Sequence, residues 1–303
     1  MSKETAITLG GHLPAEPRTL ADGVRFLEGI EYATIRGFRP LLLDIYLPVS
    51  AVPAAAVVFV HGGGWGVGTR RSMSPTIDDW APPAFERIAR AGFAVATVDY
   101  RLTGEAIFPA QLHDVKSSVR WLRSNAEALG IDGDRTVAWG ASAGGHLAAL
   151  LGLTGAAGVL EGDVGVTGVS SSVCGVIDWY GPTDLVAMEG QSDGSGPMDH
   201  DSAGSPEGSL IGGVVSELPE RAREASPISY VHRGAPPFQI KHGAADKAVP
   251  RIQSQSLATA LAHAGGRVDF ELVEGSDHMW IGAADVEAIF ESSLEFALEV
   301  TSA

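Results

Sequence analysis

A serine in the pattern G-x-S-x-G is the first feature of this sequence whose surroundings predict chemistry. Ser142 lies in GASAG at 140–144, after the apolar run 136–139 and before a helical stretch that begins at His146. A strand–turn–helix of this kind exposes the serine hydroxyl at a sharp turn, where it can act as a nucleophile. The pattern recurs around Ser192, which has neither a strand before it nor a helix after it. We therefore predict Ser142 as the nucleophile and Ser192 as a polar loop residue.

The glycine-rich run HGGGW at 61–65 follows another apolar run, 57–60. Acyl transfer builds negative charge on a carbonyl oxygen, and preorganised backbone N–H groups stabilise that charge. We predict the N–H groups of Gly63, Gly64 and Ala143 as the oxyanion-hole donors, because glycine allows the backbone to approach the reacting oxygen closely. A nucleotide-binding turn is the competing interpretation, but the run lacks the third glycine of G-x-G-x-x-G.

A serine nucleophile needs a general base, and His278 is the predicted one among the nine histidines. It follows the last apolar run, and the order nucleophile, acid, histidine requires a base late in the chain. Two aspartates, Asp184 and Asp246, each lie in a loop after an apolar run. From spacing alone, either carboxylate is suited to hold the imidazole.

Four aromatic residues flank these loops and are candidates for substrate binding: Trp65, Trp179, Tyr180 and Trp280. They would line an apolar pocket for an acyl or aryl group. Packing in the core is an equally good interpretation of each of them.

Apolar runs rich in β-branched residues predict the strands that position these loops. The runs are 56–60, 93–98, 136–139, 173–179, 238–241 and 268–273. Continuous apolar character is typical of strands buried on both faces. Helical periodicity lies between them, at 112–126, 257–264 and 286–298. This alternation predicts an α/β fold with a central, mostly parallel sheet flanked by helices, and 33–47 predicts antiparallel strands at its start.

Residues 188–223 interrupt the alternation. They are rich in Gly, Ser, Asp and Pro and show no strong period. A loop of this length is usually functional or mobile. Because strands and helices resume after it, we interpret 188–223 as a cap-like, loop-rich insertion near the active-site face. The chain is then a single domain over 1–303.

Charge and composition argue against several kinds of partner. Lys and Arg number 21 against 37 Asp and Glu, a net charge of −16, and no basic patch is present for nucleic acid or anionic membranes. The one cysteine, Cys174, excludes an internal disulfide and a multi-cysteine metal site. No apolar run is long enough for a spanning helix, and Met1 to Leu20 lacks the apolar stretch of a signal peptide. We expect a cytoplasmic protein, with homodimerisation left open.

Together these motifs resemble the α/β-hydrolase superfamily, within the bacterial carboxylesterases of the hormone-sensitive-lipase-like and feruloyl/acetylxylan-esterase-like (BD-FAE-like) group. The resemblance runs from about Asp44 to His278 and includes HGAADKAVP at 242–250. In such families the loop HG-x-x-D-x-x-VP carries the triad acid, which implies Asp246 beside Ser142 and His278. One position departs from the pattern. Hormone-sensitive-lipase-like members usually have aspartate before the nucleophile, and Ala141 favours the feruloyl/acetyl-esterase side.

The residues and the resemblance predict a serine carboxylester hydrolase that cleaves small-molecule esters of small or aromatic acyl groups through an acyl-enzyme. This chemistry needs no metal and no organic cofactor. An amidase such as an arylformamidase uses the same groups and stays an alternative. A non-catalytic ligand-binding relative of the fold is a second alternative, although such proteins usually lack a triad member.

Overall fold

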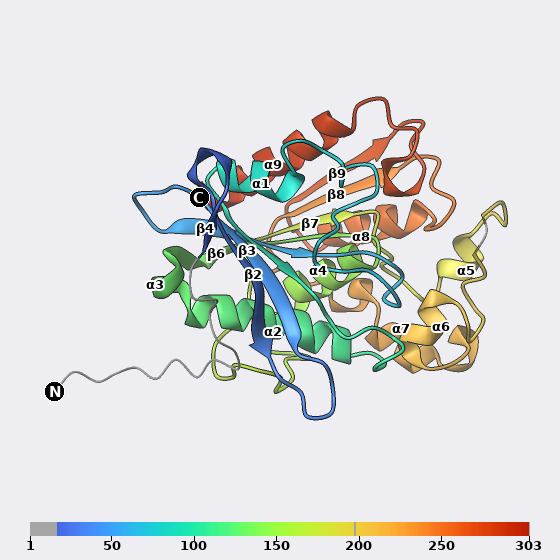
Figure 1. Cartoon of the computed structure of the whole chain (residues 1–303). Helices are drawn as coiled ribbons and strands as arrows, with labels where there is room; N and C mark the ends of the chain where they lie inside the picture. The colour runs from blue at the N-terminus through green and yellow to red at the C-terminus, as the bar shows by residue number, and fades with distance from the viewer. Residues whose placement is uncertain (1–16, 197, 303) are drawn as a thin grey trace.

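The computed structural model describes residues 17–196 and 198–302, which form one nine-stranded sheet with helices on both sides (Figure 1). The strand order is β1-β2-β3-β5-β4-β6-β7-β8-β9. The pairs β1–β2, β2–β3 and β3–β5 are antiparallel. The remaining pairs, from β5–β4 to β8–β9, are parallel. The predicted mostly parallel sheet with an antiparallel start is confirmed.

The strands are β1 (Arg18–Thr19), β2 (Arg25–Ala33), β3 (Leu41–Leu47), β4 (Ala54–Val60), β5 (Ala94–Val98), β6 (Ile131–Ala141), β7 (Gly175–Trp179), β8 (Phe238–Gly243) and β9 (Val268–Val273). The α-helices are α1 (Ala84–Arg90), α2 (Ala110–Ser124), α3 (Ala126–Leu129), α4 (Ala143–Thr154), α5 (Met188–Gln191), α6 (Pro206–Ile211), α7 (Pro219–Glu224), α8 (Ile252–His263) and α9 (Val286–Ser302). Short 3₁₀ helices are η1 (Ala21–Gly23), η2 (Val215–Glu217), η3 (Pro227–Tyr230) and η4 (His278–Trp280).

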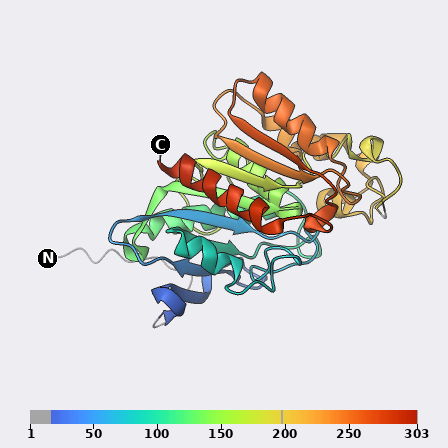
Figure 2. The same cartoon turned by 90° about the horizontal axis from the view of Figure 1, so that it is seen from above.

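The central strands are apolar along their whole length because both faces are covered. Every residue of β4, β5 and β7 is buried. Phe85 of α1 and Phe290 of α9 pack on one face of the sheet, and Leu112 of α2, Leu147 of α4 and Leu257 of α8 pack on the other. Figure 2 shows α9 lying across the strands. Helix α4 is buried all round, which explains its mostly apolar sequence.

Residues 188–223 contain more helix than the sequence predicted. Instead of a mainly irregular loop, the structure has α5, α6, η2 and α7, which gather at one end of the molecule (Figures 1 and 2). Each is too short to produce a periodic signal over a window of about 11 residues. Local capping defines α6: the Ser205 side chain accepts a hydrogen bond from the N–H of Gly208, and Gly212 ends the helix in the left-handed conformation.

The loops after β4, β6, β8 and β9 leave the sheet at the carboxyl edge of its parallel part. Ligands bind at this edge in open α/β sheets. Ser142, Asp246 and His278 follow β6, β8 and β9, so the topology collects them from distant parts of the sequence. Within the described ranges, no helix has the length and apolar character to cross a membrane.

Candidate active site

Ser142 occupies a strained turn between β6 and α4. Its φ is 56° and its ψ is −123°, an unfavourable conformation for a residue other than glycine. A Cβ at Gly140 would collide with the carbonyl oxygen of Gly144, and a Cβ at Gly144 would collide with that of Val60. Close backbone approach therefore requires both glycines of the motif. The N–H of Ser142 donates to the carbonyl of Trp179 at 2.8 Å and fixes the turn to β7.

Ser142, His278 and Asp246 form a continuous hydrogen-bonded chain. Nε2 of His278 lies 3.0 Å from Oγ of Ser142, and Nδ1 lies 2.7 Å from Oδ2 of Asp246. An ionised carboxylate only accepts, so Nδ1 donates, and Nε2 of the neutral imidazole is left to accept from the serine hydroxyl. The structure thus brings together the three residues that the sequence predicted as nucleophile, base and acid.

The Asp246 carboxylate is buried, yet both of its oxygens have donors. Oδ1 accepts from the N–H groups of Ala248 and Val249, each at 2.8 Å, and Oδ2 faces His278 and His242. Burial alone would raise the pKa of Asp246, but hydrogen bonds from the two histidines outweigh burial and hold that pKa well below its ordinary value. The carboxylate therefore stays ionised beside the imidazole.

Asp184, the other candidate acid, lies in a different network. Its Oδ1 accepts from the N–H of Ala187 at 3.2 Å, and its backbone is bonded to the side chain of Gln253. The carboxylate thus caps the turn before α5. The structure brings Asp246, and not Asp184, to His278.

The loop that carries His278 is fixed from two sides. Asp277 accepts hydrogen bonds from the N–H of His278 at 2.7 Å and from the N–H of Lys247 at 2.9 Å. These two bonds connect the loops that carry the histidine and the aspartate. On the opposite side, the hydroxyl of Thr76 donates to the carbonyl of Met279 at 2.8 Å.

The predicted oxyanion-hole residues line the same cavity as Ser142. Gly63 and Gly64 have φ values of 107° and 56°, in the left-handed region that favours glycine. Ala143 begins α4, and the first N–H groups of a helix have no partner within it. Among the described residues, none accepts a hydrogen bond from the N–H of Gly63, Gly64 or Ala143. Three unpaired N–H groups beside a serine hydroxyl are suited to bind an oxyanion.

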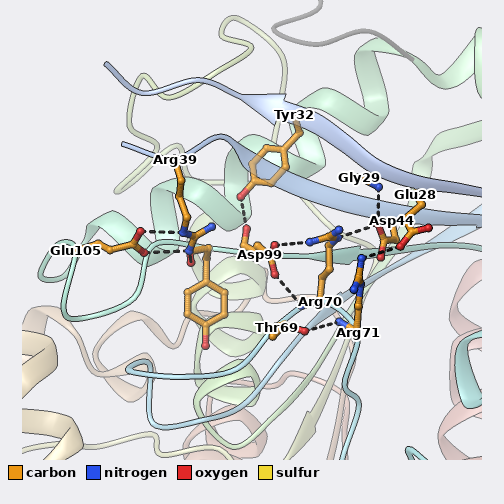
Figure 3. A network of polar contacts seen from close by, with 11 residues as sticks. Glu28, Gly29, Tyr32, Arg39, Asp44, Thr69, Arg70, Arg71, Asp99 and Glu105 are labelled. Carbon is orange, nitrogen blue, oxygen red and sulfur yellow. Dashed lines mark hydrogen bonds and ion pairs between the residues drawn. The ribbon is translucent and has the colours of Figure 1, made fainter. Parts of the chain in front are cut away.

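Arg70 anchors the end of the glycine loop to the sheet (Figure 3). Its Nε donates to Asp44 on β3 at 2.8 Å, and its Nη1 donates to Asp99 after β5 at 2.8 Å. Asp99 also accepts from the N–H of Arg70, and Asp44 from the N–H of Gly29. Burial disfavours the charge on Arg70, but both carboxylates outweigh it and raise the pKa of the guanidinium. No local pattern in the sequence indicates this ion-pair network.

A cavity of about 350 Å³ lies beside Ser142 and His278. Trp65 and Tyr180 line it, as predicted for substrate-binding residues, but Trp179 and Trp280 do not. Those two indoles are buried in the core, where their rings meet edge-on at 5.4 Å and Trp179 donates to the hydroxyl of Ser293. For this pair the core-packing interpretation is right and the pocket interpretation is wrong.

His146 holds Trp65 in the cavity wall. Nε1 of Trp65 donates to Nδ1 of His146 at 3.1 Å, and Nε2 of His146 lies 2.6 Å from the carbonyl oxygen of Ala225. Burial lowers the pKa of His146 to about 4, so the imidazole is neutral at neutral pH. The neutral ring donates at Nε2 and accepts at Nδ1.

Segment 188–223 supplies part of the cavity wall through Met198, Pro206 and Glu207. The sequence predicted that this segment lies near the active-site face, but it did not predict these three residues as part of the cavity wall. Local signals do indicate the helix α6 itself. Ser205 followed by proline is typical of a helix start, and Gly212 is typical of a helix end. No local signal indicates that α6 lies beside Gly64.

Comparisons with known proteins agree with this architecture. Esterase LipQ of Mycobacterium tuberculosis is 30% identical over 257 residues, which are 83% of this chain and 57% of LipQ. A truncated carbohydrate esterase from gut microbiota superposes with a TM-score of 0.80 at 31% identity, over 96% of this chain and 100% of that one. Sarin-phosphonylated esterase 2 of Thermogutta terrifontis gives a TM-score of 0.71 at 29% identity, over 95% of this chain and 96% of that one.

The chain spans a little over half the length of LipQ. Its sheet, helices and structural neighbours are those of the α/β-hydrolase fold. The BD-FAE family model matches residues 43–261, which include β4, Ser142 and Asp246. The chain belongs to the BD-FAE family.

Proposed function

We propose that the protein is a serine carboxylester hydrolase that acts through Ser142, His278 and Asp246. The observation that carries the proposal is the hydrogen-bonded chain from Asp246 through His278 to the hydroxyl of Ser142, at 2.7 and 3.0 Å. Membership of a family whose relatives are named esterases supports it. The cavity and the unpaired N–H groups beside the serine add the means to bind and polarise an ester.

The geometry supports a two-step reaction. Oγ of Ser142 attacks the ester carbonyl carbon while Nε2 of His278 takes the hydroxyl proton. The carbonyl oxygen becomes an oxyanion, which the N–H groups of Gly63, Gly64 and Ala143 stabilise. The C–O bond to the alcohol then breaks, and His278 returns the proton to the departing alkoxide.

Water completes the cycle. His278 removes a proton from a water molecule, the resulting nucleophile attacks the acyl carbon, and the bond to Oγ of Ser142 breaks. The released serine recovers its proton from His278, and a carboxylic acid leaves. Asp246 remains ionised throughout, holding Nδ1–H toward itself and stabilising each imidazolium that forms.

Hydrolysis of 4-nitrophenyl butyrate by the purified protein tests the proposal. We expect Ser142→Ala to lower kcat by several orders of magnitude, as the loss of a triad member does, while Ser192→Ala keeps the rate of the wild type. The matched anilide, butyryl 4-nitroanilide, tests the amidase alternative. A higher kcat/KM on the anilide would replace the ester assignment with an amide assignment.

A further inference from the structure

Tyr180, the residue after β7, has a backbone conformation that is unfavourable for a tyrosine. Its φ is 46°, in the left-handed region that favours glycine. Such strain persists only where the surrounding structure holds it, and it is concentrated at functional sites. The side chain is 1% exposed and lines the cavity. A large aromatic ring therefore stands beside the reaction site at a position where the backbone favours glycine.

The backbone at the end of β7 connects the segments that carry the triad. The carbonyl of Trp179 accepts from the N–H of Ser142 at 2.8 Å. The N–H of Tyr180 donates to the carbonyl of Lys241 at 2.8 Å, on the strand β8 that leads to the loop of Asp246. One strand end is thus bonded both to the turn of the nucleophile and to the strand before the acid.

The ring of Tyr180 adds a contact with the base. Its centroid lies 4.7 Å from that of the His278 imidazole, with the two planes at 62°. The same ring meets the indole of Trp280 at 4.7 Å and 75°. Edge-on pairs at these distances are favourable arrangements of aromatic rings. Because Trp280 is buried and packs on Trp179 in turn, the ring of Tyr180 has a firm backing.

The reaction needs such a contact at the stage of the acyl-enzyme. In the free enzyme the imidazole of His278 is bonded at both nitrogens, to Asp246 and to Ser142. Once Oγ of Ser142 carries the acyl group, it has no proton to donate to Nε2. Asp246 is then the one triad partner left to the imidazole, and a ring packed against His278 keeps Nε2 directed at the acyl carbon while water is activated.

The ring, rather than the hydroxyl, is the part of Tyr180 suited to this role. The hydroxyl is buried and has no hydrogen-bond partner in the part of the chain that the structure describes. Burial raises the pKa of Tyr180, so the phenol stays neutral and is a poor group for proton transfer.

We propose that Tyr180 is a positioning residue for the general base, its ring holding the imidazole of His278 in line with Ser142 through both steps of the reaction. The proposal rests on the esterase function proposed above. A residue that positions the base acts on kcat for every ester. A residue that only lines the cavity acts on KM, because it contributes equally to binding of the ground state and the transition state.

Hydrolysis of 4-nitrophenyl acetate and 4-nitrophenyl butyrate by two variants tests the proposal. Tyr180→Leu removes the ring, and we expect kcat to fall about 10- to 100-fold by the same factor for both esters, since a misplacement of ~1 Å can cost about 100-fold. KM should stay within about threefold of the wild type. Tyr180→Phe keeps the ring and should keep kcat within about twofold.

Phe290→Leu is the matched control, because it makes the same change from an aromatic ring to leucine in the same core cluster. The ring of Phe290 packs on Trp139 and Trp80 rather than on His278. This variant should lower the melting temperature and keep kcat within about threefold of the wild type. Tyr180→Met serves as a second variant without the ring, since the flexible thioether adapts to irregular space. Thermal melting establishes which variants are folded at the assay temperature.

Four results would overturn the inference. They are an unchanged kcat in folded Tyr180→Leu or Tyr180→Met, a rise in KM without a fall in kcat, an equal loss in Tyr180→Phe, which would assign the effect to the hydroxyl, and an equal loss in Phe290→Leu, which would assign it to core packing in general. In each case the wild-type rate shows that the esterase function stands. If the wild type hydrolyses neither ester, the proposed function itself fails, and this inference fails with it.

Discussion

Nε2 of His242 lies 3.2 Å from Oδ2 of Asp246, the same oxygen that faces Nδ1 of His278. Nε2 of His242 also lies 3.0 Å from the carbonyl oxygen of Val249, and Nδ1 lies 2.7 Å from the hydroxyl of Ser254. A carbonyl oxygen only accepts, so Nε2 donates, and His242 is a second donor toward the buried carboxylate. Two imidazole N–H groups, one from His242 and one from His278, therefore point toward the same oxygen of the Asp246 carboxylate.

His242→Gln removes an imidazole that holds the Asp246 carboxylate in place, and a less firmly held carboxylate aligns His278 less well. We expect kcat to fall about tenfold for this reason, or ~1.4 kcal/mol of transition-state stabilisation. The carboxylate, with one donor fewer, stabilises positive charge on His278 more strongly. The acid limb of the kcat/KM profile should therefore move to higher pH. Profiles of this variant and of His263→Gln, a change at an exposed position on α8, check this. Identical acid limbs would make His242 purely structural.

Asp246→Asn tests the acid of the triad. The amide keeps the shape but permits the wrong imidazole tautomer, a change that lowers kcat by about 10⁴ in the known serine-protease case. We expect a loss of roughly three to four decades in kcat with a modest change in KM. Asp184→Asn, which alters only the bond to the N–H of Ala187, should keep kcat within about tenfold. Thermal melting first establishes that both variants are folded.

Arg70→Met should destabilise the fold strongly, because it leaves the carboxylates of Asp44 and Asp99 unpaired. The side chains of Arg70 and Asp44 are only 10% and 2% exposed, and breaking one side of a buried pair costs about 3–5 kcal/mol. Arg71→Met is the matched control, since Arg71 pairs with Glu28 at the surface and such pairs contribute about 0–1 kcal/mol. Urea unfolding of both variants measures the difference. Equal midpoints would contradict the anchoring role of Arg70.

Asp178, at the carboxyl end of β7, makes stability depend on pH. Oδ1 accepts from the N–H of Gly181 at 2.9 Å, but Oδ2 is buried without a partner among the described residues, and burial raises the pKa of Asp178 from 3.8 to about 6. Between these two pKa values the folded chain binds more protons than the unfolded chain. The contribution of Asp178 to the free energy of unfolding therefore falls as pH rises from about 4 to about 6.

Asp178→Asn removes that ionisation. At pH 8 the free energy of unfolding of the variant should exceed that of the wild type by up to about 3 kcal/mol. This figure takes ~1.4 kcal/mol for each unit of the difference between the folded and unfolded pKa values of Asp178. Near pH 4 most of that gain should be lost, because Asp178 is then protonated in the folded wild type and is about 40% protonated in the unfolded chain, whose aspartate pKa is 3.8. Urea unfolding at the two pH values checks this. A gain that is the same at both would rule out titration of Asp178 as its origin.

The strands and the catalytic constellation were readable from the sequence because their signals are local. Apolar runs marked β4 to β9, and the GASAG turn marked Ser142 between β6 and α4. The choice of Asp246 over Asp184 depended on a family resemblance, since both loops follow strands of the same sheet. The geometry alone settles which carboxylate reaches His278.

Other features depend on contacts between distant segments, which local patterns do not report. Trp65 lies in the glycine-rich loop after β4 and Trp179 ends β7, and neither local pattern indicates that only Trp65 lines the cavity. Glu207 is an ordinary helix-start acid in sequence, and the packing of Pro206 against Gly64 is what places it beside the site. The ion pairs of Arg70 join the end of the glycine loop to Asp44 on β3 and to Asp99 after β5 (Figure 3).

Covalent labelling with a fluorophosphonate tests the central claim, that Ser142 is the activated nucleophile, most directly. The phosphorus reagent captures a serine whose proton a neighbouring base removes, and esterase 2 of Thermogutta terrifontis is known as a phosphonylated structure. We predict one label per chain by intact mass, located at Ser142 by peptide mapping, unchanged in Ser192→Ala and lost in Ser142→Ala and in His278→Ala. An unlabelled wild type, or a label that persists in Ser142→Ala, would contradict the assignment of the nucleophile.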